Sequence, residues 1–337
     1  MIDDRRAVSD PGALRIGILG AARIAPMALV RPAREVPEAS VLAVAARDPG
    51  KARAFARKQE IPCTHQSYDE LLADPELDAI YNPLPNALHC EWSIRALQAG
   101  KHVLCEKPMA SNVVEAERMA KVAAETGLTL VEAFHYRYHP LAARMQQIIQ
   151  ENELGEIEHI EANMCIPLVR PGDIRYRLDL AGGATMDVGC YVINLVRFLA
   201  GSEPQVVRAE AKLSSPGVDR WMSADFRFAD GRTARINCSL FSTSLIRLSA
   251  KVRGKRGELR VINPFAPQFF HRLKLWRPSG STVERIRSDS TYTHQLRAFV
   301  AAVRGGARMP TDATDAIANM RVIDAVYEKA GLTPRGL

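Results

Sequence analysis

Short apolar runs alternate with amphipathic stretches from Leu14 to about Phe134. Runs of four to six mostly apolar residues predict buried strands, and apolar positions three or four apart predict helices between them. Regular alternation of strand and helix favours an α/β domain with a parallel sheet and helices on both faces. We expect this domain to cover residues 14–134, after a loose polar tail at 1–13. The expected strands are 15–20, 41–46, 78–82, 102–105 and 128–131, and the expected helices are 51–59, 67–72, 88–99 and 113–126.

The second half of the chain follows a different pattern. Several runs with strand-like composition succeed one another, separated by turn signals such as Asp230-Gly231. This pattern is typical of a mainly antiparallel sheet, so we expect an α+β domain over residues 135–337. The final helix is expected to pack back onto the domain interface. The expected strands are 157–165, 205–213, 221–227, 233–240, 246–253 and 257–261, and the expected helices are 140–151, one from about 183, 292–304 and 314–330.

Composition narrows the class of protein. Of the 337 residues, 47% are hydrophobic and 25% are charged, as in an ordinary globular protein, and the net charge is +7. The arginines are scattered without a basic run, which argues against nucleic acid as a partner. No apolar run reaches the length of a membrane span, and none follows the N-terminus as in a secretory leader. The six cysteines are isolated, which favours a reducing compartment, and we expect a cytoplasmic protein.

A glycine-containing turn follows the first expected strand. In Gly20-Ala21-Ala22-Arg23-Ile24-Ala25 the turn connects a buried strand to a helix, which is the context of a dinucleotide fingerprint. The helix N-terminus and the turn's backbone N–H groups would bind a pyrophosphate. Only Gly20 of the usual three glycines is present, so an ordinary strand–helix turn stays open as the alternative.

The end of the second expected strand bears on the choice of cofactor. An enzyme that binds NAD usually has a carboxylate there, but this chain has Arg47, with Asp48 one position later. A guanidinium suits the 2′-phosphate of NADP, so we predict NADP as the preferred cofactor, with NAD as the alternative. Asp48 followed by Pro49 also fits a helix N-cap.

The fourth expected strand ends in Cys105-Glu106-Lys107-Pro108. Ligands bind at the carboxyl ends of strands in open α/β sheets, and Lys107 lies at such an end. Oxidation of an alcohol by hydride transfer requires a group that moves the hydroxyl proton and a charge that steadies the alkoxide. A lysine can do either, so we predict that Lys107 is catalytic. An ordinary surface lysine after a strand is the alternative.

A second candidate segment is Gly182-Gly183-Ala184-Thr185-Met186-Asp187-Val188-Gly189-Cys190-Tyr191. In a helix from about Gly183, Asp187 and Tyr191 are four residues apart and share a face. The phenol would move a proton to or from substrate oxygen, with its pKa lowered by a cation such as Lys107. The alternative is a helix-start aspartate favoured by the dipole together with a half-buried tyrosine.

Two histidines in Phe134-His135-Tyr136-Arg137-Tyr138-His139-Pro140 have the i, i+4 spacing of helical zinc ligands. No further ligand completes a motif, and Pro140 interrupts a helix through His139, so we predict no metal. We expect this segment to line the cleft between domains, where His135 and Arg137 would contact substrate. Cys105 has no activating base in the sequence and is expected to be a core thiol.

Taken in order, these segments resemble the Gfo/Idh/MocA oxidoreductases over nearly the whole chain. The resemblance rests on Ile16–Ala25, Ala45-Ala46-Arg47-Asp48-Pro49, Tyr81–His89, the Gly-Lys-His-Val…Glu-Lys-Pro run, and Gly-Gly-x-x-x-Asp-x-Gly-x-Tyr at 182–191. It implies a Rossmann domain followed by a domain with a large, open, mostly antiparallel sheet, through which members often form dimers or tetramers.

The resemblance also implies roles for individual residues. Lys107 corresponds to the family's catalytic lysine and Asp187 to its motif aspartate, whereas Tyr191 stands where many members have histidine. The tyrosine variant is similar to the xylose dehydrogenase, dihydrodiol dehydrogenase and sugar ketoreductase branches. The residues implied at the cofactor are Gly20, Ala21, Ala22, Arg23 and Ile24 at the pyrophosphate, Leu84, Pro85, Asn86 and His89 at the ribose and nicotinamide, and Glu106, Lys107 and Arg175 nearby.

The sequence therefore predicts an enzyme that oxidises a secondary alcohol, or reduces a ketone, on a sugar-like or cyclic polyol substrate. Lys107, Tyr191 and Asp187 would surround the reacting carbon. The first alternative is a cofactor-binding regulator of the same fold without catalysis, against which the intact polar trio argues. A weaker alternative is hydrolysis through a redox cycle of NAD, for which no residue pattern is present.

Overall fold

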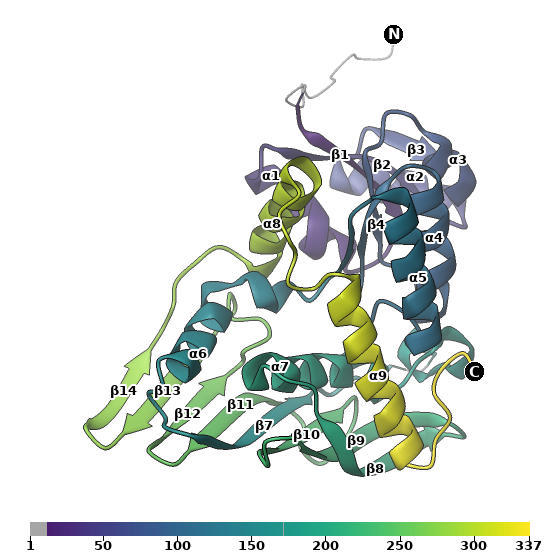
Figure 1. The fold of residues 1–337 in the computed structure, drawn as a ribbon. Coiled ribbons are helices and arrows are strands. Elements are labelled where there is room, and N and C mark those ends of the chain that lie inside the picture. The colour runs from purple at the N-terminus through teal and green to yellow at the C-terminus, as the bar shows by residue number, and fades with distance from the viewer. Residues whose placement is uncertain (1–11, 171) are drawn as a thin grey trace.

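The computed structural model describes residues 12–170 and 172–337, so the expected tail at 1–13 lies mostly outside the described residues. Two sheets form the two parts of the molecule (Figure 1). The first sheet has six parallel strands in the order β3-β2-β1-β4-β5-β6. Its strands are β1 (Leu14–Leu19), β2 (Ala39–Ala45), β3 (Cys63–His65), β4 (Ala79–Asn82), β5 (His102–Cys105) and β6 (Leu130–Glu132).

Helices connect these strands, and α2, α3 and α5 begin at residues whose side chains cap them. Asp48 accepts hydrogen bonds from two backbone N–H groups at the start of α2, and Ser67 and Asn112 cap α3 and α5 in the same way. Asp48 therefore has the N-cap position that its place before Pro49 predicted. The helices of this part are α1 (Arg31–Glu35), α2 (Pro49–Gln59), α3 (Tyr68–Ala73), α4 (His89–Gln98) and α5 (Val113–Thr126), with a π-helical turn at Pro26–Val30 before α1.

The second sheet has eight strands in the order β14-β13-β12-β11-β7-β10-β9-β8. The central pair β7 and β10 is parallel, and all other neighbours are antiparallel. The strands are β7 (Ile157–Cys165), β8 (Gln205–Ser215), β9 (Val218–Arg227), β10 (Thr233–Ser239), β11 (Arg247–Gly254), β12 (Gly257–Ile262), β13 (Arg272–Arg277) and β14 (Gly280–Glu284).

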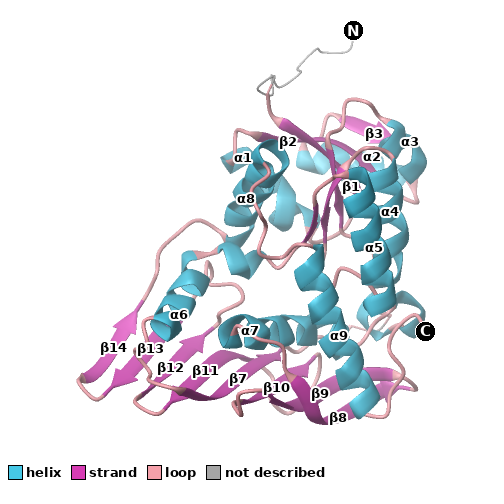
Figure 2. Cartoon of the chain, viewed as in Figure 1, coloured by secondary structure: helices cyan, strands magenta, loops and turns pink. Residues whose placement is uncertain are grey.

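The α-helices that the structure describes in the second half of the chain are α6 (Pro140–Gln150), α7 (Cys190–Ala200), α8 (Thr291–Gly305) and α9 (Ala313–Lys329). Helices α6, α7 and α9 lie on one side of the large sheet, between it and the first part of the molecule (Figure 2). Helix α7 is buried along almost its whole length. Burial on all sides explains why its sequence is nearly uniformly apolar.

Helix α8 packs away from the large sheet, although its sequence lies within the second half of the chain (Figure 1). Leu296 and Phe299 belong to the same buried cluster as Ile16, Leu29 and Val36 of the first part. The chain therefore returns to complete the core around the parallel sheet. The expected division at residue 134 therefore assigns α8 to the wrong core. A sequence pattern shows that a helix has an apolar face, but it does not show which element that face packs against.

The predicted fold class is confirmed, and most element boundaries shift by only one to three residues. Strands β3, β13 and β14 were not predicted from the sequence, and the helix expected from Gly183 begins at Thr185 with a π-helical turn, Thr185–Gly189. Strands β3 and β14 are short and lie at sheet edges, so their alternation is weak. Strand β13 does alternate, with Leu273 and Leu275 buried between less buried polar residues, so its pattern was present in the sequence. None of the helices in the described residues is long and apolar enough to span a membrane.

Candidate active site

The turn after β1 is open toward a cavity and offers backbone donors. Gly20 has a φ of 89°, and a Cβ atom there would lie 3.1 Å from a methyl carbon of Leu84. Both facts favour glycine at this one position. In the described part of the chain, the N–H groups of Ala21, Ala22 and Arg23 have no acceptor. Unpaired N–H groups before a helical turn suit an anion such as a pyrophosphate. The turn therefore fits a dinucleotide although two of its usual glycines are alanines.

Arg47 follows the end of β2 and is exposed to solvent. Its guanidinium forms no ion pair with a carboxylate of the described residues, and it does not line the cavity described below. The neighbouring phenol of Tyr68 has a raised pKa, because burial outweighs the effect of Arg47. Arg47 thus follows the strand next to the nucleotide turn without a counterion among residues 12–170 and 172–337.

Lys107 follows the last residue of β5, and its side chain is mostly buried. Its Nζ donates to the backbone oxygen of Asp187 at 2.9 Å and lies 3.5 Å from the Oδ1 atom of that residue. Burial alone would lower the pKa of Lys107, but Asp187, together with Cys190 and Glu106, outweighs this effect and the pKa is raised. Lys107 is therefore an ammonium at neutral pH, which suits it to stabilise negative charge rather than to act as a base.

Asp187 lies in the π-helical turn that precedes α7 and pairs with two cations. Its Oδ1 is 2.9 Å from Nε of Arg175 and 3.5 Å from Nζ of Lys107. Burial raises the pKa of Asp187, but Lys107 and Arg175 together bring it below its ordinary value. The carboxylate is consequently ionised and neutralises charge that would be costly in a buried site.

Tyr191, in the first turn of α7, completes this group. The Nζ atom of Lys107 lies 4.9 Å from the centroid of the Tyr191 ring, a cation–π contact. The Tyr191 hydroxyl is 3.0 Å from Nε2 of His135. Burial, followed by Tyr292 and Glu106, raises the pKa of Tyr191 well above its ordinary value. The prediction that Lys107 lowers this pKa is therefore wrong, because desolvation of the phenolate dominates.

Glu106 and His89 fix the backbone around the same cavity. The Tyr81 hydroxyl donates to Oε1 of Glu106 at 2.6 Å. Burial raises the pKa of Glu106, although Lys107 acts in the opposite direction. The two ring nitrogens of His89 lie 2.7 Å from the backbone oxygen of Leu84 and 2.8 Å from that of Pro108; burial lowers the pKa of His89 to about 4, so the neutral ring donates to one of them. Both side chains face the cavity while their partners hold the adjoining loops.

These residues surround one cavity of about 710 Å³ between the two parts of the molecule. It is the size of a cofactor or substrate site. All the residues predicted at the cofactor except Arg47, and all three predicted catalytic residues, line it. The lining residues are Gly20, Ala21, Ala22, Arg23, Ile24, Met27, Pro83, Leu84, Pro85, Asn86, His89, Glu106, Lys107, Met164, Ile166, Ile174, Arg175, Leu180, Gly182, Gly183, Asp187, Val188, Tyr191 and Tyr292.

The two glycines before Asp187 pack too closely for side chains. A Cβ atom on Gly183 would lie 2.1 Å from an oxygen of Asp219, and Gly183 has a φ of 135°. Asp219 is fully buried and accepts from Thr185, Tyr327 and Arg335. This buried anchor positions the turn that holds Asp187.

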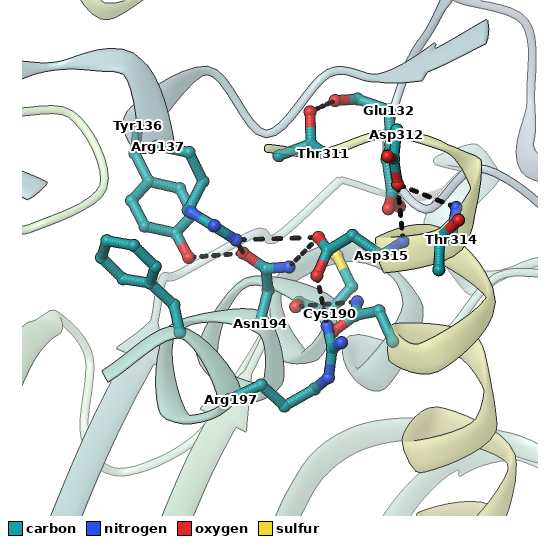
Figure 3. A network of polar contacts seen from close by, with 12 residues as sticks. Glu132, Tyr136, Arg137, Cys190, Asn194, Arg197, Thr311, Asp312, Thr314 and Asp315 are labelled. Atoms are coloured by element: carbon teal, nitrogen blue, oxygen red, sulfur yellow. Dashed lines mark hydrogen bonds and ion pairs between the residues drawn. The ribbon is translucent and has the colours of Figure 1, made fainter. Parts of the chain in front are cut away.

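Arg137 does not lie where the sequence predicted. It does not line the cavity and belongs instead to a polar network between α7 and α9 (Figure 3). Its Nη1 is 3.3 Å from Oδ1 of Asn194 and 3.6 Å from a carboxylate oxygen of Asp315, which also pairs with Arg197. We predicted that Arg137 contacts substrate, but its guanidinium instead contacts α7 through Asn194 and α9 through Asp315. The sequence carried no sign of this, because the partners are more than 50 residues away.

His135 is buried behind the cavity rather than in its wall, so the expected contact with substrate is revised as well. His135 bonds Tyr191 and Thr291, whereas His139 accepts from the backbone N–H of Leu141 as the N-cap of α6. Within residues 12–170 and 172–337, no group of three or more histidine, cysteine, aspartate or glutamate side chains is arranged to hold a metal.

Several wall residues could not be identified from the sequence. Met164 and Ile166 lie at the end of β7, and Tyr292 comes from the start of α8. Their segments were predicted, but nothing local indicates that these side chains face Lys107. The return of α8 to the first part of the molecule brings Tyr292 to the site, and this is a tertiary feature.

A turn with free donors, a buried lysine at a strand's carboxyl end and a neighbouring phenol define a nicotinamide-dependent oxidoreductase. The comparisons agree with this class. The family model described as "Oxidoreductase family, NAD-binding Rossmann fold" matches residues 14–134, and the GFO/IDH/MocA C-terminal domain matches residues 142–260. The chain belongs to the Gfo/Idh/MocA family, as its motifs predicted, and it is an enzyme.

Individual relatives cover almost the whole chain. D-xylose 1-dehydrogenase (NADP(+)) 2 of Haloferax volcanii is 34% identical, over 94% of this chain and 97% of its own. A dTDP-3,4-didehydro-2,6-dideoxy-alpha-D-glucose 3-reductase of Streptomyces violaceoruber is 33% identical, over 95% and 96%. Among solved structures, the 3-ketoreductase KijD10 of Actinomadura kijaniata, in complex with NADP and TDP-benzene, superposes with a TM-score of 0.88 at 30% identity, over 94% and 98%.

Two further structures of that ketoreductase carry single substitutions, tyrosine to phenylalanine in one and lysine to alanine in the other. The two substituted positions are separated along its chain by the same number of residues as Lys107 and Tyr191 are here. The expected nicotinamide cofactor is confirmed at the level of the family.

Proposed function

We propose that the protein transfers a hydride between NADP and a secondary alcohol, ketone or lactol of a sugar-like or cyclic polyol substrate. One observation carries this proposal. The Lys107 ammonium lies between the Asp187 carboxylate and the ring of Tyr191, and all three groups face the cavity that the nucleotide turn also lines. The oxygen of a reacting CH–OH group requires a cation that stabilises its developing negative charge and a neighbouring group that exchanges its proton, and Lys107 and Tyr191 can supply these.

The reaction divides between the cofactor and the chain. When bound, the nicotinamide supplies the acceptor or donor of the hydride. In the oxidative direction the carbinol carbon loses a hydride, the hydroxyl loses a proton and a C=O bond forms. Tyr191 would accept that proton as its phenolate, and in the reductive direction the neutral phenol would donate it to the substrate oxygen. Lys107 would stabilise the negative charge that develops on oxygen, and Asp187 would hold Lys107 charged and in place.

The preference for NADP rests on Arg47. Its guanidinium just after β2, which pairs with no carboxylate of the described residues, suits a 2′-phosphate, and two of the relatives above are described with NADP. The backbone from Gly20 to Ile24 would bind the pyrophosphate. The ribose and nicotinamide would lie against Leu84, Pro85, Asn86 and His89, with Glu106 and Arg175 at the nicotinamide end.

A sugar-like substrate is supported by the relatives, which are described as xylose and deoxysugar enzymes. It is also consistent with the lining of the cavity, which includes the apolar residues Met164 and Ile166 and the ring of Tyr292 besides the polar trio. A mixed lining of this kind suits a ring that carries both hydroxyl and C–H groups.

We also propose a cytoplasmic homodimer or homotetramer formed through the large sheet. The face of this sheet opposite α7 carries no helix of the described chain (Figure 2). Light scattering tests the proposal, and a monomer at micromolar concentration would contradict it.

The proposed function is tested by measuring reduction of NADP and NAD against a panel of aldoses, cyclic polyols and dihydrodiols, with wild type and Tyr191→Phe in parallel. We expect turnover with at least one sugar-like substrate, faster with NADP, and its loss in the variant. Tight binding of NADPH without turnover on any member would favour a regulator, which no structural observation supports at present.

A further inference from the structure

The hydroxyl of Tyr191 has a partner outside the cavity. It lies 3.0 Å from Nε2 of His135, a buried ring that is only 4% exposed. The other ring nitrogen, Nδ1, lies 2.7 Å from Oγ1 of Thr291, and that hydroxyl lies 3.2 Å from Oε1 of Gln268. Four side chains from four segments of the chain therefore form one hydrogen-bonded row that ends at the phenol.

The donor and the acceptor of each hydrogen bond in this row can be assigned from the neutral His135 ring and from the Gln268 oxygen, which only accepts. Burial, together with the Lys107 cation, lowers the pKa of His135 to about 3, so the ring is neutral and has one N–H. The Thr291 hydroxyl donates to Gln268, and its oxygen accepts from Nδ1–H of His135. The remaining nitrogen, Nε2, has only a lone pair, so it accepts a hydrogen bond from the Tyr191 hydroxyl.

Packing holds the histidine ring in this orientation. The ring of Tyr292 lies against it, with centroids 4.0 Å apart and planes inclined by 32°. The ring of Tyr191 meets it edge to face at 5.8 Å. Tyr191 and Tyr292 both line the cavity, whereas His135 does not. His135 can therefore reach substrate only through the phenol in front of it.

We propose that His135 is a positioning residue for Tyr191: its neutral Nε2 accepts a hydrogen bond from the phenol hydroxyl and so keeps the lone pairs of the phenol oxygen available to a substrate hydroxyl. This inference rests on the proposed function and assigns to it a residue behind the site. Without this acceptor, the Tyr191 hydroxyl would adopt other orientations. Misplacement of a reacting group by about 1 Å costs on the order of 100-fold in rate.

The kinetic test compares three variants. His135→Leu removes the acceptor, whereas His135→Gln supplies an amide oxygen that can accept in its place. His139→Asn is the control: it changes another buried histidine of the same segment, and asparagine can still cap α6. Turnover is measured with the fastest substrate of the panel above. We expect kcat to fall about 10- to 100-fold in His135→Leu, with KM and the Kd of NADPH nearly unchanged. The Gln variant should recover much of the loss, and His139→Asn should behave as wild type.

A double-mutant cycle separates this role from a general loss of structure. In a Tyr191→Phe background, His135→Leu should have no further effect on single-turnover rate, because its effect acts through the phenol. An equal loss in both backgrounds, or no loss in either, would overturn the role of His135. If Tyr191→Phe alone keeps wild-type turnover, the proposed function of Tyr191 fails as well, and the two failures are thus distinguishable.

A measurement without substrate is also available. The ¹⁵N resonances of the eight histidines report which ring nitrogen carries the proton, and His135→Gln identifies the signal of His135. We expect a neutral ring protonated at Nδ1, with its Nε2 signal shifted by Tyr191→Phe. A ring protonated at Nε2 would contradict the proposal.

Discussion

At the scale of single residues, burial and charge pairing decide the state of each polar group in the site. Lys107 stays an ammonium because Asp187 and other neighbours such as Glu106 together offset the cost of burying it, whereas Tyr191 stays a neutral phenol because burial and neighbours such as Tyr292 and Glu106 disfavour a phenolate. The sequence identified these residues through their spacing. It could not give their protonation, since this depends on neighbours such as Arg175 and His135.

Replacement of Lys107 tests its role as a charge. Lys107→Met keeps most of the side-chain volume and removes the ammonium. We expect kcat to fall by about 10²–10³, as when one stabilising donor is removed from a reacting oxygen. The Kd of NADPH should change little by comparison. Steady-state kinetics and a fluorescence titration measure the two quantities, and an unchanged kcat would contradict the role.

Asp187 gives a prediction about pH. Burial lowers the pKa of Lys107 and Asp187 raises it, so Asp187→Asn should lower that pKa. The ammonium would then be lost at a lower pH, and the alkaline limb of the kcat/KM profile should move toward neutral pH. Asp173→Asn is the matched control, because Asp173 pairs with Arg175 but makes no ion pair with Lys107. A profile in Asp187→Asn that matches wild type would refute the coupling.

Arg47 belongs to the same scale and bears on the cofactor. Arg47→Ala should weaken NADP binding much more than NAD binding, because only NADP carries the phosphate that the guanidinium would contact. The Kd values of NADPH and NADH give the result directly. Equal losses for both cofactors would remove the basis of the NADP preference.

At the scale of elements, the turn before α7 depends on a buried anchor far away in sequence. Gly183→Ala would place a Cβ against Asp219 in a backbone conformation that disfavours alanine. We expect a loss of unfolding free energy of about 2–4 kcal/mol, from overpacking together with the unfavourable φ. Gly306→Ala is the control, since Gly306 also has a positive φ but open space around it, and should cost only about 1 kcal/mol. Equal costs, measured by denaturant unfolding, would exclude the packing argument.

The elements themselves could largely be predicted from periodicity. Strand β5 and helix α5 were found with exact bounds, because β5 is a short, mostly apolar run and α5 begins at the capping residue Asn112 and ends at Gly127. Strand β13, between β12 and β14, was not predicted, although its apolar residues alternate. The edge strand β14 and the two π-helical turns were not predicted either, because their stability comes from neighbours rather than from local pattern. The walls contributed by β7 and α8 were missed for the same reason.

At the scale of the whole molecule, the cavity joins the two parts of the chain. Arg23 of the nucleotide turn lies 3.6 Å from Asp173, and Asn86 donates to the backbone oxygen of Ala181 at 3.0 Å. A cofactor in this cavity would contact both parts at once. Saturation with NADPH at 100 times its Kd should therefore raise the unfolding free energy by about 2.7 kcal/mol. A thermal melt measures this, and an unshifted melting temperature would contradict cofactor binding here.

The central claim is that the phenol of Tyr191 takes part in proton transfer within a cofactor-binding cavity. The most direct test is the single-turnover rate of NADPH formation by wild type and Tyr191→Phe, each saturated with NADP and with the best substrate of the panel. The account predicts a rate at least about 100-fold lower in the variant, with an unchanged Kd for NADPH. Equal rates in the two proteins would contradict it.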